Sequence, residues 1–296
     1  MQAMILAAGF GTRLQPFSQH KPKPLFPVLN KPLLVATIER LREAGFSRMV
    51  VNCHHLKEQI IEAVSLFPEV IVQVEEQILG TGGGSRRALK HLDDAPLLIT
   101  NGDIYHSLDF ARIYQHHVQA NQQITMVLHD YPRFNNVLIK GSTVTGFATG
   151  SMVQGARAYT GVQVVDPALL ESIAPDRSSC IIEHYRGLLG QAAKISVLEA
   201  ACQWTDMGSP EDYLKLHEAL LTGGLACWPE LGRTVDHPIL IHPQASLAGQ
   251  VDIRDWGCVG RAQIGAGAKL TRCVVWDGAK IEAGAVLSDS IIAPEH

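Results

Sequence analysis

The segment MILAAGFGTRLQPFSQHKPKPLFPV, residues 4–28, decides the fold class. It opens with an apolar run that is typical of the buried first strand of a parallel sheet. Gly9 and Gly11 then allow backbone N–H groups to approach an anion closely, and Arg13 adds a planar cation that suits phosphate. Lys23 lies between two prolines that fix an extended path, so we expect it to return to the same anion. The segment therefore predicts a phosphate-binding loop. It is not a Walker P-loop, because it lacks Gly-Lys-Ser/Thr, and it lacks the third glycine of the dinucleotide fingerprint.

Strand and helix patterns alternate along the next hundred residues. Short connections between such elements predict right-handed βαβ units and a mainly parallel α/β sheet, with ligands beyond the carboxyl ends of the strands. The apolar periodicity predicts helices at 33–44 and 56–66, and strands at 49–52, 70–74, 96–100 and 124–128.

Two segments are expected to border the ligand crevice. The glycine-rich segment 75–84, EEQILGTGGG, follows a predicted strand, and we interpret it as a loop that lets backbone approach a flat ligand before a helix at 85–91. Asp103 follows a glycine at the end of a buried strand, where its carboxylate would face the crevice. Asp109 is better placed than Asp103 to cap the next helix.

A second motif, WTDMGSPEDY, covers residues 204–213. Ser209 is a predicted N-cap for a helix that begins with Pro210 and continues to about Leu221. Asp206 precedes this cap, so its carboxylate is available for another role.

The C-terminal residues form a repeat. From Ile241 to Ile292 an apolar residue recurs at steps of five or six, with Gly and Ala between, which is typical of the hexapeptide repeat of a parallel β-helix of about three coils. Gly223, Gly224 and Pro229 mark a linker. We therefore predict a catalytic domain at 1–222, a linker at 223–238 and a β-helix at 239–296.

Together these motifs resemble the sugar-1-phosphate nucleotidyltransferases, whose signatures are Gly-x-Gly-Thr-Arg-Leu-x-Pro, Lys-Pro-Leu-x-Pro-Val, Leu-Gly-Thr-x-Gly and Trp-x-Asp-x-Gly-Ser/Thr-Pro-Glu-Asp-Tyr. The resemblance implies a Rossmann-like, mainly parallel catalytic domain followed by a left-handed β-helix. It implies catalysis by Arg13, Lys23, Asp103 and Asp206, and Mg²⁺ held by Asp103 and Asp206. It implies nucleotide binding by Ala8, Gly9, Gly11, Thr12, Arg13, Lys23, Gln77, Thr81 and Gly82, and sugar binding by Asn101, Gly161, Glu183 and His184. His184 stands where relatives often have Lys or Asp, and a helix-surface histidine is an equal alternative.

The substrates implied by the resemblance are an NTP, either UTP or GTP, and a sugar-1-phosphate. The segment LGTGGG and the replacement of a Val-Glu-Lys-Pro string by residues 148–151 are most like N-acetylmuramate-1-phosphate uridylyltransferases, which gives UTP as the first expectation. The β-helix is typical of guanylyltransferases for mannose or heptose phosphates, which is the alternative. A non-catalytic nucleotide-sugar-binding regulatory subunit and a β-helix acyltransferase are the alternatives from other classes.

Composition excludes several other partners. The 296 residues carry a net charge of −4 with mixed signs, so neither nucleic acid nor a membrane surface is expected as a partner. We see no signal peptide or transmembrane run, and the six scattered cysteines without Cys-x-x-Cys predict reduced thiols in a cytoplasmic protein. Association of copies through the β-helix is a further expectation.

Overall fold

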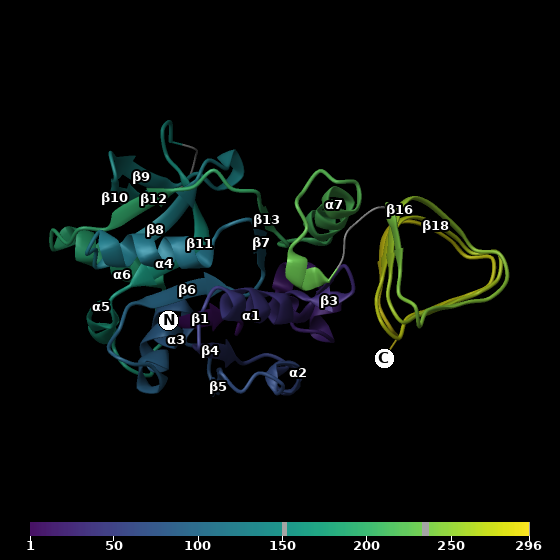
Figure 1. Ribbon diagram of the computed structural model, residues 1–296, viewed down its shortest axis with the longest axis horizontal. Coiled ribbons are helices and arrows are strands. Elements are labelled where there is room, and N and C mark those ends of the chain that lie inside the picture. The colour runs from purple at the N-terminus through teal and green to yellow at the C-terminus, as the bar shows by residue number, and fades with distance from the viewer. Residues whose placement is uncertain (150–152, 233–236, 296) are drawn as a thin grey trace. The chain divides into compact units, whose positions relative to one another are not determined.

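The computed structural model describes residues 1–149, 153–232 and 237–295 (Figure 1). Part of the segment 148–151, at which the sequence departs from its relatives, and part of the predicted linker therefore lie outside the described residues. The chain divides into two compact units, of which the first comprises Met1–Phe10 and Thr37–Trp204 and the second comprises Gly11–Ala36 and Thr205–His296. This division cuts across the boundary expected at residue 222, which stays a prediction.

The first unit is built on one nine-stranded sheet. Its strand order is β5 (Val70–Val74), β4 (Arg48–Cys53), β1 (Gln2–Leu6), β6 (Leu97–Asn101), β11 (Ala158–Val165), β8 (Ile124–His129), β12 (Ser196–Glu199), β10 (Thr143–Phe147) and β9 (Val137–Lys140). The first four strands pair in parallel, as the alternating pattern predicts. Strand β11 lies antiparallel between β6 and β8, so the sheet is mixed beyond β6.

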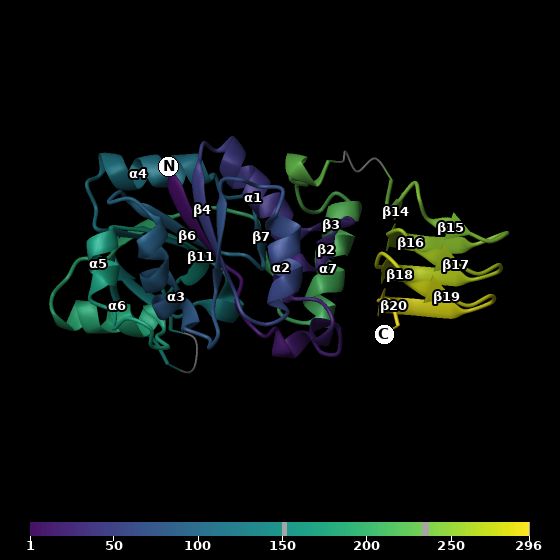
Figure 2. The ribbon, with the colours of Figure 1, turned by 90° about the horizontal axis from the view of Figure 1, so that it is seen from below.

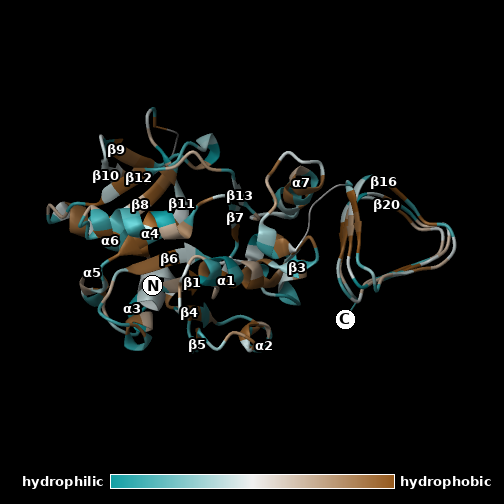
Figure 3. Ribbon diagram, viewed as in Figure 1, coloured by the Kyte–Doolittle hydropathy of each residue, from teal (hydrophilic) through white to brown (hydrophobic). Residues whose placement is uncertain are grey.

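Helices cover the sheet and bury its apolar side chains. The helices of the first unit are α2 (Lys57–Val64), α3 (Gly80–Ala88), α4 (Phe110–Gln119), α5 (Pro167–Glu171) and α6 (Ile181–Gly190), while α1 (Leu33–Glu43) begins in the second unit and ends in the first. The core includes the fully buried Met126 and Tyr185. In Figure 3, β6 and β8 are mainly hydrophobic and the visible side of α4 is hydrophilic, as expected for half-exposed helices on a buried sheet.

Several helices end or begin at residues that favour a helix terminus. Gly45 has a φ of 89° just after α1, and the Asp109 side chain caps α4 by accepting a hydrogen bond from the Arg112 amide at 3.0 Å. Strands β9 and β10 form a hairpin around residues 141–142. A short strand, β7 (Ile104–His106), follows Asp103.

The glycine-rich segment is not the loop that the sequence predicts, because α3 already begins at Gly80. Its glycines are needed for packing between protein segments. A Cβ on Gly83 would lie 2.3 Å from the Arg177 carbonyl oxygen, and one on Gly82 would lie 2.9 Å from Ser179 Oγ. The Gly82 amide also donates to the Ser179 carbonyl at 2.8 Å. Close approach of residues 177–181 explains Gly80, Gly82 and Gly83, and a Cβ on Gly84 would lie 3.0 Å from Glu75 Oε1, so a ligand is not required to explain the glycines.

The second unit begins with three short 3₁₀ turns and a hairpin of β2 (Pro27–Val28) and β3 (Lys31–Pro32). Strand β13 (Trp204–Asp206) enters it from the first unit, and α7 (Pro210–Leu221) follows. As predicted, the Ser209 hydroxyl caps α7 by accepting from the Asp212 amide at 3.1 Å, with Pro210 at the first helical position.

The end of the chain forms two parallel sheets that stack one coil on the next, named here the C-terminal stack (Figures 1 and 2). One sheet is β14 (Ile239–Ile241), β16 (Asp252–Val259), β18 (Lys269–Val275) and β20 (Val286–Ile292), and the other is β15 (Ser246–Leu247), β17 (Gln263–Ile264) and β19 (Lys280–Ile281). Ile253, Leu270 and Leu287 share one register. Parallel coils of this kind are consistent with the predicted β-helix.

Two further expectations concern membranes and cysteines. Within the ranges that the structure describes, no helix combines the length and the apolar character needed to cross a bilayer. All six cysteines are free thiols, and Cys53, Cys258 and Cys273 are buried. Burial raises the pKa of the Cys53 thiol to about 11, with the Glu75 carboxylate adding to the shift, so this thiol stays protonated at neutral pH.

Candidate functional site

A cavity of about 220 Å³ lies in the first unit at the carboxyl ends of its parallel strands. Strand β1 ends at Leu6 and β6 at Asn101, and both residues line the cavity. This is where α/β sheets bind their ligands. The complete lining comprises Leu6, Ala8, Gly9, Asn52, Ile78, Gly80, Thr81, Asn101 and Asp103. The structure therefore brings together the predicted site residues Ala8, Gly9, Thr81, Asn101 and Asp103.

Gly161 lies in β11, next to Asn101, which lines the cavity. It adopts a φ of 83°, and a Cβ at this position would lie 2.9 Å from both Asn101 Nδ2 and Ile104 Cδ1. Only glycine combines this backbone conformation with so close a neighbour. The Trp204 indole donates to the Thr160 carbonyl at 2.9 Å, which fixes the strand just before Gly161.

Four further predicted residues of the first unit lie outside the cavity lining. Gln77 is exposed, and Gly82 is buried where α3 packs on residues 177–181. Glu183 pairs with Arg186 on the surface of α6, with 2.5 Å between Oε1 and Nη1. His184 Nε2 donates to the Leu169 carbonyl at 2.9 Å, as expected for a structural histidine. Their predicted roles in nucleotide and sugar binding stay predictions.

Sequence reasoning missed a buried polar network that supports the cavity wall. The Glu75 carboxylate is 1% exposed and accepts hydrogen bonds from Asn52 Nδ2 at 2.8 Å, Gln73 Nε2 at 3.2 Å and the Leu79 amide at 2.9 Å. Asn52 Oδ1 accepts from the Ala7 amide at 2.8 Å. The network thus joins the chain just before the phosphate loop to the start of α3. The available signal was Asn52 itself, a polar residue near the end of an otherwise apolar buried strand.

The second unit carries a cluster of charges formed by three of the four predicted catalytic residues. Lys23 Nζ lies 3.1 Å from Asp206 Oδ1, and Arg13 Nη2 lies 3.4 Å from Asp206 Oδ2. The side chains of Lys23 and Asp206 are only 8% and 13% exposed, whereas that of Arg13 is 62% exposed. Asp206 is therefore engaged by two cations, which sequence reasoning did not anticipate.

The backbone near this cluster is constrained by its close packing. A Cβ on Gly208 would lie 2.5 Å from Asp206 Oδ2 and 2.7 Å from Arg13 Nη1, so a larger residue there would displace the ends of both side chains. Gly11 has a φ of 62° and begins the turn that carries the exposed Thr12 and Arg13. The Lys23 stem lies against Gly11, because a Cβ there would be 3.2 Å from Lys23 Cβ. The two predicted cations thus belong to one packed loop.

The Asp103 carboxylate has the chemistry that a hard divalent cation requires. Across residues 1–149, 153–232 and 237–295, no group of three or more His, Cys, Asp and Glu side chains is placed to hold a metal. Mg²⁺ does not require such a group, because it takes one or two carboxylates and completes its shell with water and substrate phosphates. Asp103 beside Asn101 in the cavity supplies oxygen ligands of this kind.

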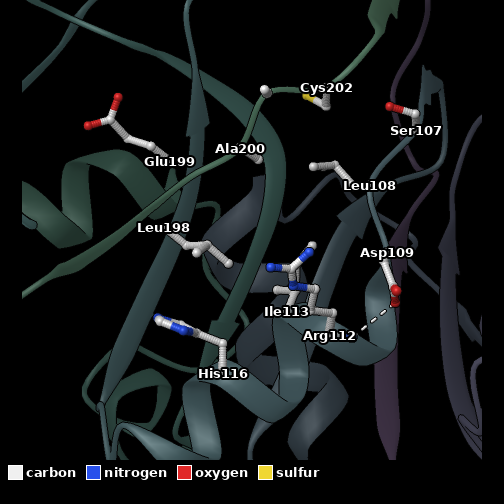
Figure 4. Close-up of a pocket in the computed structure, with 11 residues that line it drawn as sticks. Ser107, Leu108, Asp109, Arg112, Ile113, His116, Leu198, Glu199, Ala200 and Cys202 are labelled. Atoms are coloured by element: carbon white, nitrogen blue, oxygen red, sulfur yellow. Dashed lines mark hydrogen bonds between the residues drawn. The ribbon is translucent and has the colours of Figure 1, made fainter.

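A larger cavity of about 430 Å³ lies elsewhere in the first unit and is lined by none of the predicted site residues. Figure 4 shows Arg112 and His116 projecting from α4 toward the segment that contains Leu198 and Ala200. The Asp109 carboxylate already caps the first turn of α4, so this helix terminus does not offer an anion site.

Comparison with known proteins agrees with the family that the sequence resembles. The model of the family described as nucleotidyl transferase matches residues 2–136. A probable mannose-1-phosphate guanylyltransferase 1 of Oryza sativa subsp. japonica is 27% identical over 99% of this chain and 86% of its own length. The mannose-1-phosphate guanylyltransferase of Mycobacterium tuberculosis is 29% identical over 97% of this chain and 83% of its own length.

A solved structure supports the fold. The crystal structure of a putative glucose-1-phosphate thymidylyltransferase from Bacillus anthracis matches with a TM-score of 0.68 at 16% identity, covering 78% of this chain and 99% of that one. The family model and the curated relatives support the enzyme activity that the sequence predicted, that of a sugar-1-phosphate nucleotidyltransferase. The relatives favour the alternative of a guanylyltransferase over the first expectation of a uridylyltransferase.

Proposed function

We propose that the protein transfers a guanylyl group from GTP to mannose-1-phosphate, giving GDP-mannose and pyrophosphate. The observation that carries this proposal is the extent of the similarity to mannose-1-phosphate guanylyltransferases. It covers 97–99% of the chain and so includes the C-terminal stack as well as the phosphate loop.

The residues of the site suit an in-line displacement. A phosphate oxygen of the sugar-1-phosphate forms a bond to the α-phosphorus of GTP, and the bond from the α-phosphorus to the bridging oxygen breaks. The electron pair of that bond leaves with pyrophosphate. The attacking oxygen is already anionic at neutral pH, so no general base is required. Arg13 and Lys23 would bind the triphosphate and offset the charge that develops on the leaving group.

Asp103 and Asp206 are the residues that would hold Mg²⁺, which would neutralise phosphate charge and align the reacting groups when bound. Asp206 would also keep the two cations in place, since both lie within 3.4 Å of its carboxylate. The cavity lining around Thr81 would receive the nucleobase, and Asn101 with Gly161 would face the sugar.

The C-terminal stack would be a left-handed β-helix that follows a catalytic domain ending near residue 222. We further propose that the enzyme acts in the cytoplasm, where its reduced cysteines would be stable. Association of copies through the stack remains part of this proposal.

The test is pyrophosphate release from five NTPs combined with a panel of sugar-1-phosphates in the presence of Mg²⁺. GTP with mannose-1-phosphate is expected to have the highest kcat/KM, and Lys23→Met is expected to lower kcat by about a hundredfold or more. Lys215→Met is the matched control, because Lys215 makes an exposed pair with Glu211 on α7. A clear preference for UTP and N-acetylmuramate-1-phosphate would overturn the proposal and restore the first expectation.

A further inference from the structure

Trp276, in the C-terminal stack, contacts both segments that carry the charge cluster of the second unit. It is 3% exposed and follows directly after β18. Its ring centroid lies 4.7 Å from that of Phe26 and 5.8 Å from that of Phe17. Its indole nitrogen donates a hydrogen bond to the Tyr213 hydroxyl at 3.1 Å.

The contact with Phe26 reaches the Lys23 segment. Phe26 is fully buried, and its amide donates to the Lys23 carbonyl at 3.0 Å, so the two residues belong to one 3₁₀ turn. An aromatic ring packed on Phe26 therefore limits the movement of the turn that delivers the Lys23 ammonium.

The contact with Tyr213 reaches the Asp206 segment. The Tyr213 amide donates to the Ser209 carbonyl at 3.0 Å, in the first turn of the helix that starts just after Asp206. The Tyr213 hydroxyl in turn donates to the Pro27 carbonyl, which belongs to the lysine-bearing segment. One hydroxyl thus links the stack, α7 and the phosphate loop.

Further contacts secure the same arrangement. Asn30 Nδ2 donates to the Val259 carbonyl of β16 at 3.0 Å, and the buried His217 of α7 accepts from the Leu29 amide at 3.3 Å. The residues that follow Lys23 are therefore attached to the stack and to α7 at several points. The rings of Trp276, Phe26 and Tyr213 are also stabilised by their edge-to-face contacts, in addition to the burial of their apolar surface.

We propose that Trp276 and Tyr213 are positioning residues through which the C-terminal stack holds Lys23 and Asp206 in the geometry needed for transfer. The stack would then contribute to turnover within one chain, in addition to any role in assembly. That Lys23 and Asp206 serve the transfer rests on the proposed function, whereas the contacts themselves do not.

The stack offers a matched control. Trp256 in β16 is also 3% exposed, but its indole nitrogen has no hydrogen-bond partner among the described residues. Trp256→Phe and Trp276→Phe therefore remove the same atoms from the same small domain, and only the second removes the link to Tyr213. Tyr213→Phe removes that link while keeping the ring.

The experiment measures kcat and KM for GTP in the full-length protein carrying each substitution. Trp276→Phe and Tyr213→Phe are expected to lower kcat by about tenfold with little change in KM, because a small displacement of a charged group suffices for such a loss. Trp256→Phe is expected to keep wild-type kcat. In a Lys23→Met background the effect of Trp276→Phe on kcat should shrink to less than about threefold, because both changes act through the Lys23 ammonium.

A second readout does not depend on activity. The rate at which an amine-reactive reagent labels Lys23, followed by peptide mass spectrometry, should rise several-fold in Trp276→Phe and Tyr213→Phe and stay constant in Trp256→Phe. Equal labelling rates in all variants, or an equal fall of kcat in Trp256→Phe, would overturn the inference. A wild-type protein that releases no pyrophosphate, but shows the expected labelling, would refute the proposed function and leave the positioning role intact.

Discussion

Replacement of Gly83 by alanine tests how closely α3 packs on the segment before α6. The added Cβ would lie 2.3 Å from the Arg177 carbonyl oxygen and 3.1 Å from Leu79 Cβ. Ordinary contact begins near 3.4 Å, so the helix and residues 177–179 must separate by about 1 Å. Both groups belong to backbone or to a buried side chain, so no flexible end can move aside.

The separation has a cost that can be estimated. Overpacking costs about 1–3 kcal/mol, and the hydrogen bonds from the Gly82 amide to the Ser179 carbonyl and from the Ser179 amide to the Leu79 carbonyl, both 2.8 Å, would weaken at about 1 kcal/mol each. The higher helix propensity of alanine offsets about 1 kcal/mol of this loss. The free energy of unfolding should therefore fall by about 3 kcal/mol.

Gly187 provides the control, because it lies inside α6 and an added Cβ meets nothing within 4 Å. Gly187→Ala should raise the free energy of unfolding by about 1 kcal/mol. Urea unfolding followed by far-UV circular dichroism measures both variants. Gly83→Ala should also raise KM for GTP, because Gly80 and Thr81 at the start of the same helix line the cavity. Equal midpoints for the two variants would refute the packing argument.

Three further perturbations follow from buried polar groups. Asp206→Ala should abolish pyrophosphate release and lower stability by about 3 kcal/mol, because it breaks the ion pair with the buried Lys23. Stability, but not activity, should return in the double variant with Lys23→Met. Glu75→Ala removes an acceptor shared by three buried donors, of which Gln73 Nε2 keeps its bond to the Gly84 carbonyl, so urea unfolding should show a loss of about 2–3 kcal/mol, and a variant of wild-type stability would contradict the network. Burial lowers the pKa of His217 to about 4, from 6.5 in the unfolded chain. The free energy of unfolding should therefore fall by about 1.4 kcal/mol per pH unit as the pH drops from 6.5 to about 4. The unfolding of His217→Gln should depend less steeply on pH in this range, and an unchanged slope would contradict this assignment.

Local chemistry let the sequence determine much of the fold. The parallel order of the first strands follows from alternating apolar runs and short connections, and helix ends follow from Asp109, Ser209 and Gly45, whose effects act within a few residues. The steps of five or six residues after Ile241 likewise predict stacked coils, because each coil repeats the same local turn.

The sequence also predicted several of the residues that line the cavity at the ends of the strands. Ala8, Gly9, Asn101 and Asp103 all follow or end a parallel strand, and the carboxyl ends of such strands meet at one edge of the sheet. Asn52 was missed because its neighbours in the sequence are apolar and its partners, Ala7 and Glu75, are distant along the chain.

Only the tertiary structure decided the remaining features, since each depends on contacts between distant segments. The glycines after Leu79 lie in a helix whose Gly80, Gly82 and Gly83 pack against residues 177–181, where a Cβ would be too close. Strand β11 enters the sheet antiparallel between β6 and β8, which no local pattern specifies. Asp206 meets Lys23 across 183 residues, and Trp276 joins the segments that carry them. Such pairings depend on which buried surfaces fit together, and a linear sequence pattern does not contain that information.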